Sequence, residues 1–219
     1  MQKLGIIHTV SRLAPVFDGL VGEYLPGVGT VVIADELLLQ RTIRDGAVDG
    51  ITRERLAQHV EQLASYGVDA VLVTCSSVGA AVDELAATSE VPVLRVDRAM
   101  AERAVGMGRT IGVLATLPTT LVPTVDLVRS AADGQARDVT ILPRLCEGAF
   151  DALGRGDVEL HDAIIADELD QLVAQVDVVV LAQASMARVA EGRETGGVPV
   201  LSSPRLAIEQ IAQSIATPL

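Results

Sequence analysis

Short apolar runs rich in valine and isoleucine alternate along the chain with longer stretches of helical periodicity. The first pattern is typical of buried strands and the second of amphipathic helices. The eight expected strands are residues 4–9, 29–35, 68–74, 91–96, 110–116, 138–143, 176–182 and 198–203. The clearest expected helices are residues 53–66, 158–175 and 204–215. Strands and helices in alternation predict an α/β fold with parallel sheets and right-handed crossovers.

The second half of this pattern repeats the first. The first four strands return in the same order about 107 residues later, with part of their sequence preserved. VDAVLVTCSSVG (68–79) matches VDVVVLAQASMA (176–187) without a gap, and VPVL recurs unchanged at 91–94 and 198–201. The matched identities are Gly5/Gly112, Thr9/Thr116, Val68/Val176, Asp69/Asp177, Val71/Val179 and Ser77/Ser185. Chance likeness between strands does not explain the preserved order and spacing, so we infer an internal duplication.

A unit repeated only twice predicts two similar lobes related by a pseudo-twofold axis. We expect residues 1–96 with 204–219 in lobe one and residues 97–203 in lobe two, each a Rossmann-like lobe with a parallel sheet. The final helix, residues 204–215, would cross back to cover lobe one. Ligands of open α/β sheets bind beyond the carboxyl ends of the strands. We therefore expect an active site in a cleft where the two sets of strand ends face each other.

Composition narrows the class of partner. Apolar residues make up 49% of the 219 residues but aromatic residues only 2%, so the core must be aliphatic. The formal charge of −12 and the lack of a basic run argue against nucleic acid. No apolar stretch reaches the roughly 18 residues that span a bilayer, so we expect no membrane partner and a soluble, cytoplasmic protein. Nucleotide-binding glycine motifs are missing from the sequence, which gives no support for a nucleotide cofactor.

The segment TCSSVG (74–79) carries the chemistry that we consider first. Cys75 follows the third expected strand and precedes a helical segment at residues 80–88. Free N–H groups and the helix dipole at such a position stabilise a thiolate, and they also suit a substrate carboxylate. A buried inert cysteine is the alternative. The flanking Thr74, Ser76 and Ser77 favour a functional thiol over a packed one.

The duplication supplies a second set of candidates. Gln183 occupies in lobe two the place that Cys75 holds in lobe one, and its amide can hydrogen-bond but cannot shuttle a proton. His8, at the end of the first strand, could act as an acid or base or could simply pack. Hydroxyl groups that could bind substrate follow several strands. They belong to Thr9, Ser11, Ser76, Ser77, Thr116, Thr119, Thr120 and Ser185, although such residues are also common in turns and caps.

The remaining cysteine and histidines are not expected to act in catalysis. Cys146 lies past a strand end and should pack, and His59 and His161 lie in expected helices where they should be solvated or hydrogen-bonded. The two cysteines have different local contexts, so we expect reduced thiols, no disulfide and no metal cluster.

With the duplication and the Cys75 segment in view, the chain resembles the aspartate/glutamate/hydantoin racemase superfamily over nearly its full length. The segment at residues 74–78 is similar to A-C-N-T-A of that family. LAQASM (181–186) aligns with L-G-C-A-G-M, but Gln183 replaces the second cysteine. The resemblance implies cofactor-independent chemistry, two pseudo-symmetric lobes and a homodimer or higher homo-oligomer. Two-cysteine racemisation needs an acid on each face of the substrate, and Gln183 does not provide one.

Three functions follow from these observations. The first is a cofactor-independent isomerase or racemase for a small carboxylate-bearing substrate, with Cys75 as proton acceptor or nucleophile, Gln183 bonding an enolate and His8 supplying a second proton. The second is a decarboxylase-like lyase with Cys75 as proton donor. One-cysteine decarboxylation is known in the superfamily, though with the cysteine in the second lobe. The third is a non-catalytic protein that binds small acids.

Overall fold

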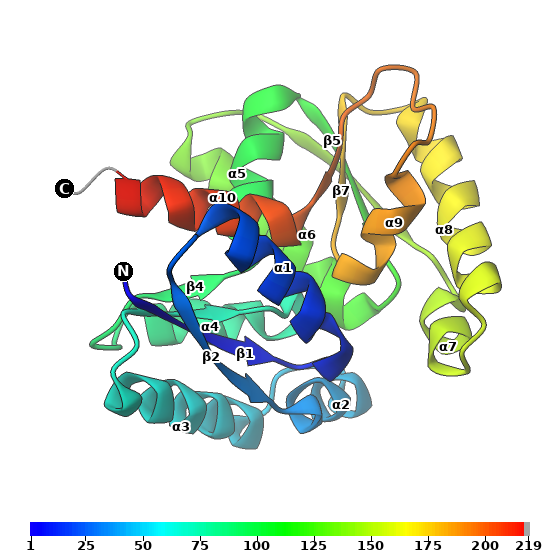
Figure 1. The fold of residues 1–219 in the computed structure, drawn as a ribbon. Helices are drawn as coiled ribbons and strands as arrows, with labels where there is room; N and C mark the ends of the chain where they lie inside the picture. Colours follow the sequence, from blue (N-terminus) through cyan, green and yellow to red (C-terminus); the bar gives the residue numbers. More distant parts are fainter. Residues whose placement is uncertain (217–219) are drawn as a thin grey trace. The chain divides into compact units, whose positions relative to one another are not determined.

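The computed structural model describes residues 1–216, and the chain divides into two compact units (Figure 1). Lobe one comprises residues 1–97 and the segment from Pro204, and lobe two comprises residues 98–203. Asp97 thus lies one residue beyond the expected boundary, in lobe one. The reason is local, because its carboxylate pairs with Arg95 at the end of a lobe-one strand.

Lobe one is a parallel sheet with the strand order β2-β1-β3-β4. Its strands are β1 (Lys3–His8), β2 (Gly29–Ala34), β3 (Ala70–Val73) and β4 (Val93–Arg95). Its helices are α1 (Ala14–Tyr24), α2 (Glu36–Asp45), α3 (Gly50–Tyr66), α4 (Gly79–Ala86) and α10 (Ser203–Ala216), with the 3-10 turns η1 (Ser11–Leu13) and η2 (Ser76–Val78). Parallel strands buried on both faces explain the continuous apolar runs in the sequence.

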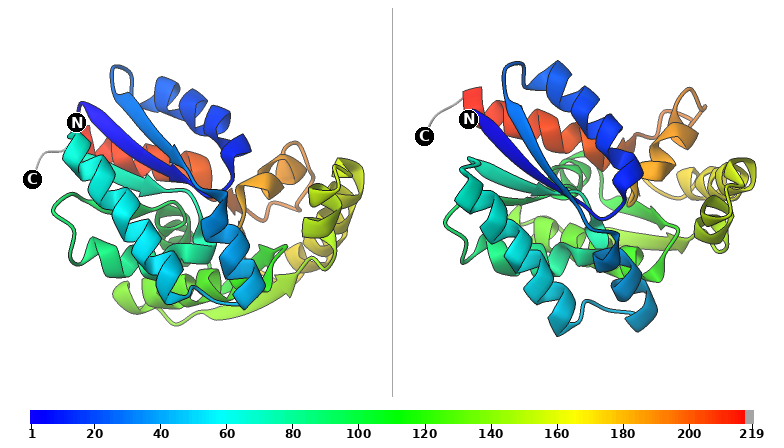
Figure 2. Two further views of the ribbon diagram at one scale, coloured as in Figure 1. Left: turned by 90° about the horizontal axis from the view of Figure 1, so that it is seen from below. Right: turned by 60° about the horizontal axis from the view of Figure 1, so that its bottom comes forward.

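Alternate residues of β1 face two different helical layers. Ile7 packs in a cluster with Leu38 of α2 and Leu56 of α3. Ile6 packs on the other face, with Phe17 of α1 and Ile208 of α10 in the same cluster. Figures 1 and 2 show α1 and α10 on one side of the lobe-one sheet and α2 and α3 on the other. The last helix of the chain therefore completes the core of lobe one.

Lobe two has the equivalent order, β6-β5-β7-β8, and is also parallel. Its strands are β5 (Thr110–Ala115), β6 (Thr140–Leu145), β7 (Val178–Leu181) and β8 (Val200–Ser202). Its helices are α5 (Arg98–Met107), α6 (Pro118–Gly134), α7 (Ala149–Gly154), α8 (Val158–Val173) and α9 (Ala187–Ala190), with the 3-10 turn η3 (Ala184–Met186). The predicted α/β class and parallel sheets are confirmed.

The two lobes share side-chain contacts made by residues that the sequence repeat matches. Asp69 accepts hydrogen bonds from the N–H groups of residues 2 and 3, at 2.6 and 2.9 Å. Asp177 accepts the equivalent pair from residues 109 and 110, both at 2.8 Å. A Cβ on Gly112 would lie under 3.0 Å from the Leu172 side chain, and a Cβ on its counterpart Gly5 would lie 3.0 Å from the Leu63 Cδ1 atom, so a helix leucine packs closely on the glycine in each lobe. Residues that the repeat matches therefore make the same contacts in both lobes.

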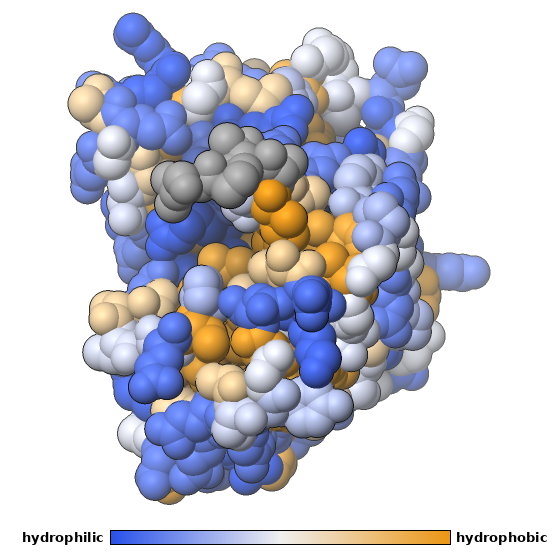
Figure 3. Space-filling view, turned by 60° about the vertical axis from the view of Figure 1, so that its left-hand side comes forward, coloured by the Kyte–Doolittle hydropathy of each residue, from blue (hydrophilic) through white to orange (hydrophobic). Residues whose placement is uncertain are grey.

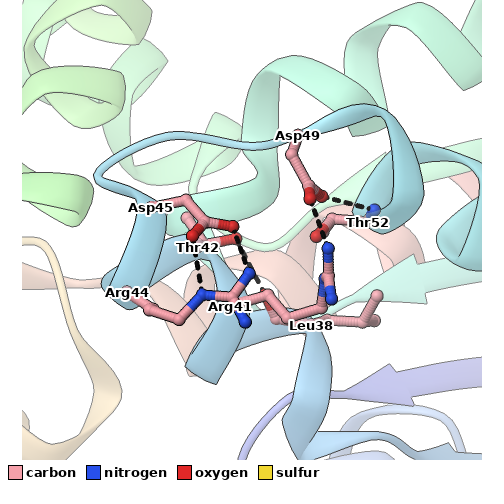
Figure 4. Close-up of polar contacts among 7 residues, drawn as sticks. All are labelled: Leu38, Arg41, Thr42, Arg44, Asp45, Asp49 and Thr52. Atoms are coloured by element: carbon pink, nitrogen blue, oxygen red, sulfur yellow. Dashed lines mark hydrogen bonds and ion pairs between the residues drawn. The ribbon is translucent and has the colours of Figure 1, made fainter.

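The junction between α2 and α3 explains why α3 starts earlier than the periodicity indicated. Asp49 caps α3 by accepting from the Thr52 N–H at 2.7 Å, and it also pairs with Arg41 of α2 (Figure 4). The hydrogen bond from the Thr52 N–H and the Arg41 guanidinium hold the pKa of Asp49 well below its usual range. The capped helix therefore begins at Gly50 and not at residue 53.

The surface is rich in charge. Figure 3 shows many hydrophilic residues on the surface, with apolar residues exposed between them. Across the described residues, no helix combines the length and the apolar character that crossing a bilayer requires.

Candidate functional site

Cys75 follows β3 directly, and its backbone is extended, with φ −141° and ψ 114°. We call residues 75–78, which comprise Cys75 and the η2 turn that follows it, the thiol loop. The Cys75 sulfur accepts hydrogen bonds from the Thr9 hydroxyl, from the N–H groups of Ser77 and Val78, and from the Ser77 hydroxyl. The loop thus directs several donors at one sulfur atom, as expected for a cysteine at the start of a helical segment.

Burial of Cys75 and these hydrogen bonds have opposite effects on the pKa of its thiol. Cys75 keeps part of its surface exposed, yet desolvation by the surrounding protein raises the pKa of its thiol, while the four hydrogen bonds lower it. The net direction is upward from 9.0, so the resting group is a protonated thiol at neutral pH. The helix start therefore supplies the expected donors without producing the expected stabilised thiolate.

Gln183 holds the equivalent place in lobe two, between β7 and η3, and its backbone is also extended, with φ −133° and ψ 138°. Its Oε1 accepts from the Thr116 N–H at 2.6 Å, and its Nε2 donates to the Thr116 hydroxyl at 2.7 Å. Thr116 is the sequence counterpart of Thr9. Each lobe therefore joins a threonine after its first strand to the polar residue after its third strand.

The other predicted hydroxyl groups fall into two sets. Ser76, Ser77, Thr116 and Thr120 are buried near strand ends, and Thr119 and Ser185 are partly buried. The Thr119 hydroxyl oxygen is buried without a hydrogen-bond partner at the start of α6. Ser11 differs, because it is exposed and its hydroxyl donates to the Glu36 carboxylate at 2.6 Å. The structure therefore does not bring Ser11 together with the thiol loop.

His8 lies in the core and not at an open strand end. Its side chain is fully buried, and its ring centre lies 5.4 Å from that of Phe17, on the α1 side of the sheet. The Nδ1 atom is 2.8 Å from the Thr74 hydroxyl, which donates to the Ile7 carbonyl. Nδ1 therefore carries the proton and Nε2 has no partner. Burial lowers the pKa of His8 from 6.5.

That placement separates His8 from the thiol. Cys75 packs against the cluster of α2, α3 and α4, on the face of the sheet opposite to Phe17. Thr9, one residue after His8, contacts the sulfur instead. The structure thus brings together Thr9, Cys75 and Ser77, but it places the imidazole on the far side of the strand.

The residues expected to be structural are largely so. Cys146 is fully buried, and burial raises the pKa of its thiol to about 12. His59 Nε2 lies 2.7 Å from the buried Asp35 carboxylate. His161 is not solvated, because it is fully buried with Nδ1 2.7 Å from Asp162. Within residues 1–216, no group of His, Cys, Asp and Glu side chains could hold a metal ion.

Two residues next to the thiol loop were not among the predicted site residues. Gly79 starts α4 directly after the loop, and Arg95 ends β4 with its guanidinium buried beside Gly79. An arginine at the end of an apolar strand was the available signal in the sequence.

Comparisons with known proteins agree with this structure. No curated protein matched the sequence. The glutamate racemase isoform RacE1 from Bacillus anthracis superposes with a TM-score of 0.74 and 16% identity, over 98% of this chain and 82% of that one. An allantoin racemase from Klebsiella pneumoniae gives 0.69 and 15%, over 99% and 88%. An aspartate racemase from Picrophilus torridus gives 0.71 and 13%, over 97% and 95%. At these identities the structures show a shared fold.

The sequence profile of one family provides the assignment. The Asp/Glu/hydantoin racemase profile matches residues 30–211, which include the thiol loop and Gln183. The match covers most of the chain, and the duplicated lobes and the Cys75 segment agree with it. The chain belongs to the Asp/Glu/hydantoin racemase family.

Proposed function

We propose that this protein is an isomerase that moves a proton next to the carboxylate of a small substrate, with Cys75 as its single reacting thiol. The observation that carries the proposal is the set of donors around the Cys75 sulfur, together with an amide and not a second thiol at the equivalent position of lobe two. Family membership supports the racemase type of isomerase. The proposal requires that both sets of strand ends contribute to one site, as the duplication predicts.

A single thiol limits the reactions. Once its thiol has released its proton to solvent, Cys75 can remove a substrate proton as the thiolate and return it as the thiol, but only on one face of the planar enolate. Such a base supports exchange of the α-proton or a proton shift along one face. Inversion requires a donor on the other face, and the Gln183 amide cannot protonate carbon. We therefore assign Gln183 to hydrogen-bonding, through the one N–H of Nε2 that Thr116 does not use.

The substrate carboxylate would be held by hydroxyl groups. The Thr116 hydroxyl accepts from Gln183, so its own proton is available to a ligand. The Thr119 hydroxyl lies at the start of α6, where N–H groups also favour an anion. Ser76, Thr120 and Ser185 complete the set that we propose, whereas the Thr9 and Ser77 hydroxyls donate to the Cys75 sulfur and Ser11 is occupied by Glu36. We assign His8 to supporting Thr74 and not to proton transfer.

One observation favours a second candidate, a decarboxylase-like lyase. Burial raises the pKa of Cys75, which keeps the thiol protonated and suits it to donate. In that reaction the bond to the carboxylate breaks, carbon dioxide leaves, and the electron pair forms an enolate. The Cys75 thiol then protonates the carbon, and the thiolate regains a proton from water. Only one proton donor is needed.

Reaction in deuterated water separates the candidates. The panel should contain small amino, hydroxy and dicarboxylic acids with their amides and ureides, because the similar structures include glutamate, aspartate and allantoin racemases. An isomerase incorporates deuterium into recovered substrate or its isomer. A lyase releases carbon dioxide and leaves deuterium in the shortened product. Binding of an acid with neither outcome would support a non-catalytic binding protein and refute both candidates.

A further inference from the structure

Arg95 is a buried cation beside the segment that carries the thiol. Its side chain is only 5% exposed at the end of β4. The guanidinium makes two hydrogen bonds to Asp97, at 2.9 and 3.0 Å, and Asp97 is fully buried. A third contact reaches Asp83 of α4. Burial alone would lower the pKa of Arg95, but the charges of Asp97 and Asp83 raise it, so the cation is fully formed.

The guanidinium also lies against the backbone of Gly79. A Cβ at this position would lie under 3.0 Å from the Nη2, Cζ and Nε atoms of Arg95, closer than real side chains approach. Gly79 has ordinary helical dihedrals, with φ −56° and ψ −40°, so its backbone conformation does not require glycine. Close approach of Arg95 is therefore the reason for a glycine here.

Gly79 is joined directly to the donors of the thiol. Its N–H donates to the Ser76 carbonyl and closes η2. The two residues between them, Ser77 and Val78, provide the N–H groups that point at the Cys75 sulfur. The Arg95 guanidinium packs against Gly79 and binds Asp83 in the next turn of α4. These contacts therefore restrain the backbone that carries the Ser77 and Val78 N–H groups.

Lobe two lacks this arrangement. Strand registry pairs Val73 with Arg95 in lobe one and Leu181 with Ser202 in lobe two, so Ser202 takes the place of Arg95. The gapless match puts Ala187 in the place of Gly79. The arginine and the glycine that accommodates it are thus both present in the lobe with the thiol and both replaced in the lobe with Gln183.

We infer that Arg95 is a positioning residue for Cys75, which holds the thiol loop through Gly79 and keeps the Ser77 and Val78 N–H groups aimed at the sulfur. Two carboxylates surround the guanidinium, so Arg95 acts by shape and hydrogen-bond geometry more than by its charge. A lysine, which keeps the charge but lacks the planar fork, should not replace it. The inference concerns the thiol itself and does not depend on the proposed function.

The test is the pH dependence of Cys75 alkylation by iodoacetamide, in a Cys146→Ser background. Gly79→Ala displaces the guanidinium with the smallest possible change, and Arg95→Lys removes the fork. Both should move the pH profile to higher pH and slow alkylation at pH 8 on the order of tenfold, because misaligned N–H groups stabilise the thiolate less. Ala187→Gly is the matched control at the lobe-two position and should leave the profile unchanged.

A purely structural role would lower the melting temperature without moving the alkylation profile, so circular dichroism and thermal melting accompany each variant. If Arg95→Lys does not fold, Gly79→Ala alone decides the question. The inference is overturned if folded Gly79→Ala follows the wild-type profile within about twofold, if its profile moves to lower pH, or if Ala187→Gly shifts it equally. No substrate is needed, so failure here leaves the proposed function to its own test.

Discussion

Gln183 hydrogen-bonds to Thr116 through both ends of its side-chain amide: Oε1 accepts from the Thr116 N–H at 2.6 Å, and Nε2 donates to the Thr116 hydroxyl at 2.7 Å. Thr116 is buried, so its N–H has no water to replace the lost partner. Gln183→Ala should therefore lower the free energy of unfolding by about 1–3 kcal/mol, measured by urea denaturation. Gln175→Ala, which removes an exposed amide bond, is the control. Equal effects of the two substitutions would show that the Gln183 pair does not stabilise lobe two.

Thr9 makes the corresponding contact in lobe one, where its hydroxyl donates to the Cys75 sulfur and lowers the pKa of the thiol. Thr9→Val keeps the side-chain shape and removes the donor. We expect the alkylation profile of Cys75 to move to higher pH, with a rate at pH 8 reduced roughly five- to tenfold. Thr9→Ser keeps the donor and should stay close to wild type. A Thr9→Val profile that overlays the wild-type profile would show that this hydrogen bond does not stabilise the thiolate.

Cys146 should be inert in the folded protein. It is fully buried, and burial raises the pKa of its thiol to about 12. At pH 8 iodoacetamide should modify one cysteine in the native protein and two after denaturation in urea. Mass spectrometry of the digested protein identifies the modified residue. Native modification of Cys146 at a rate comparable to Cys75 would contradict the packing of this lobe.

His8 makes stability depend on pH. Burial lowers the pKa of its imidazole below the unfolded value of 6.5, so the unfolded chain takes up a proton that the folded chain does not. This contribution to stability is complete above pH 6.5 and is lost as the pH falls toward the folded pKa. His8→Gln keeps an N–H for Thr74 but does not titrate, so its free energy of unfolding should fall less steeply between pH 7 and 5. Parallel pH dependences of the two proteins would rule out a buried neutral His8.

The fold could be predicted from the sequence because each strand of a doubly covered parallel sheet is a continuous apolar run. The repeated sequence segments that begin at Val68 and Val176 also indicated two equivalent sheets. The strand register between β1 and β3 matches that between β5 and β7. Cys75 and Gln183 could be placed at matching strand ends for the same reason. These features are local in the sequence or repeat at a fixed spacing.

Contacts between distant side chains could not be predicted in this way. Ser11 follows a strand end like Thr9, but a carboxylate 25 residues away binds its hydroxyl. His8 stands where a catalytic base could stand, but the alternation of β1 turns its ring toward Phe17. Gly79 looks like an ordinary small residue after a polar loop until the buried guanidinium of Arg95 is seen beside it. Each of these contacts joins residues of two different elements, whose approach cannot be read from the local sequence pattern.

The most direct test of the central claim is exchange of the α-proton in deuterated water, comparing wild type with Cys75→Ser across the panel of small acids. We expect at least one acid to exchange with wild type, and we expect Cys75→Ser to lose roughly 10²-fold or more of that rate while Cys146→Ser retains it. Exchange that survives in Cys75→Ser, or a wild-type protein that exchanges none of the acids, would contradict the assignment of Cys75 as the group that moves the proton.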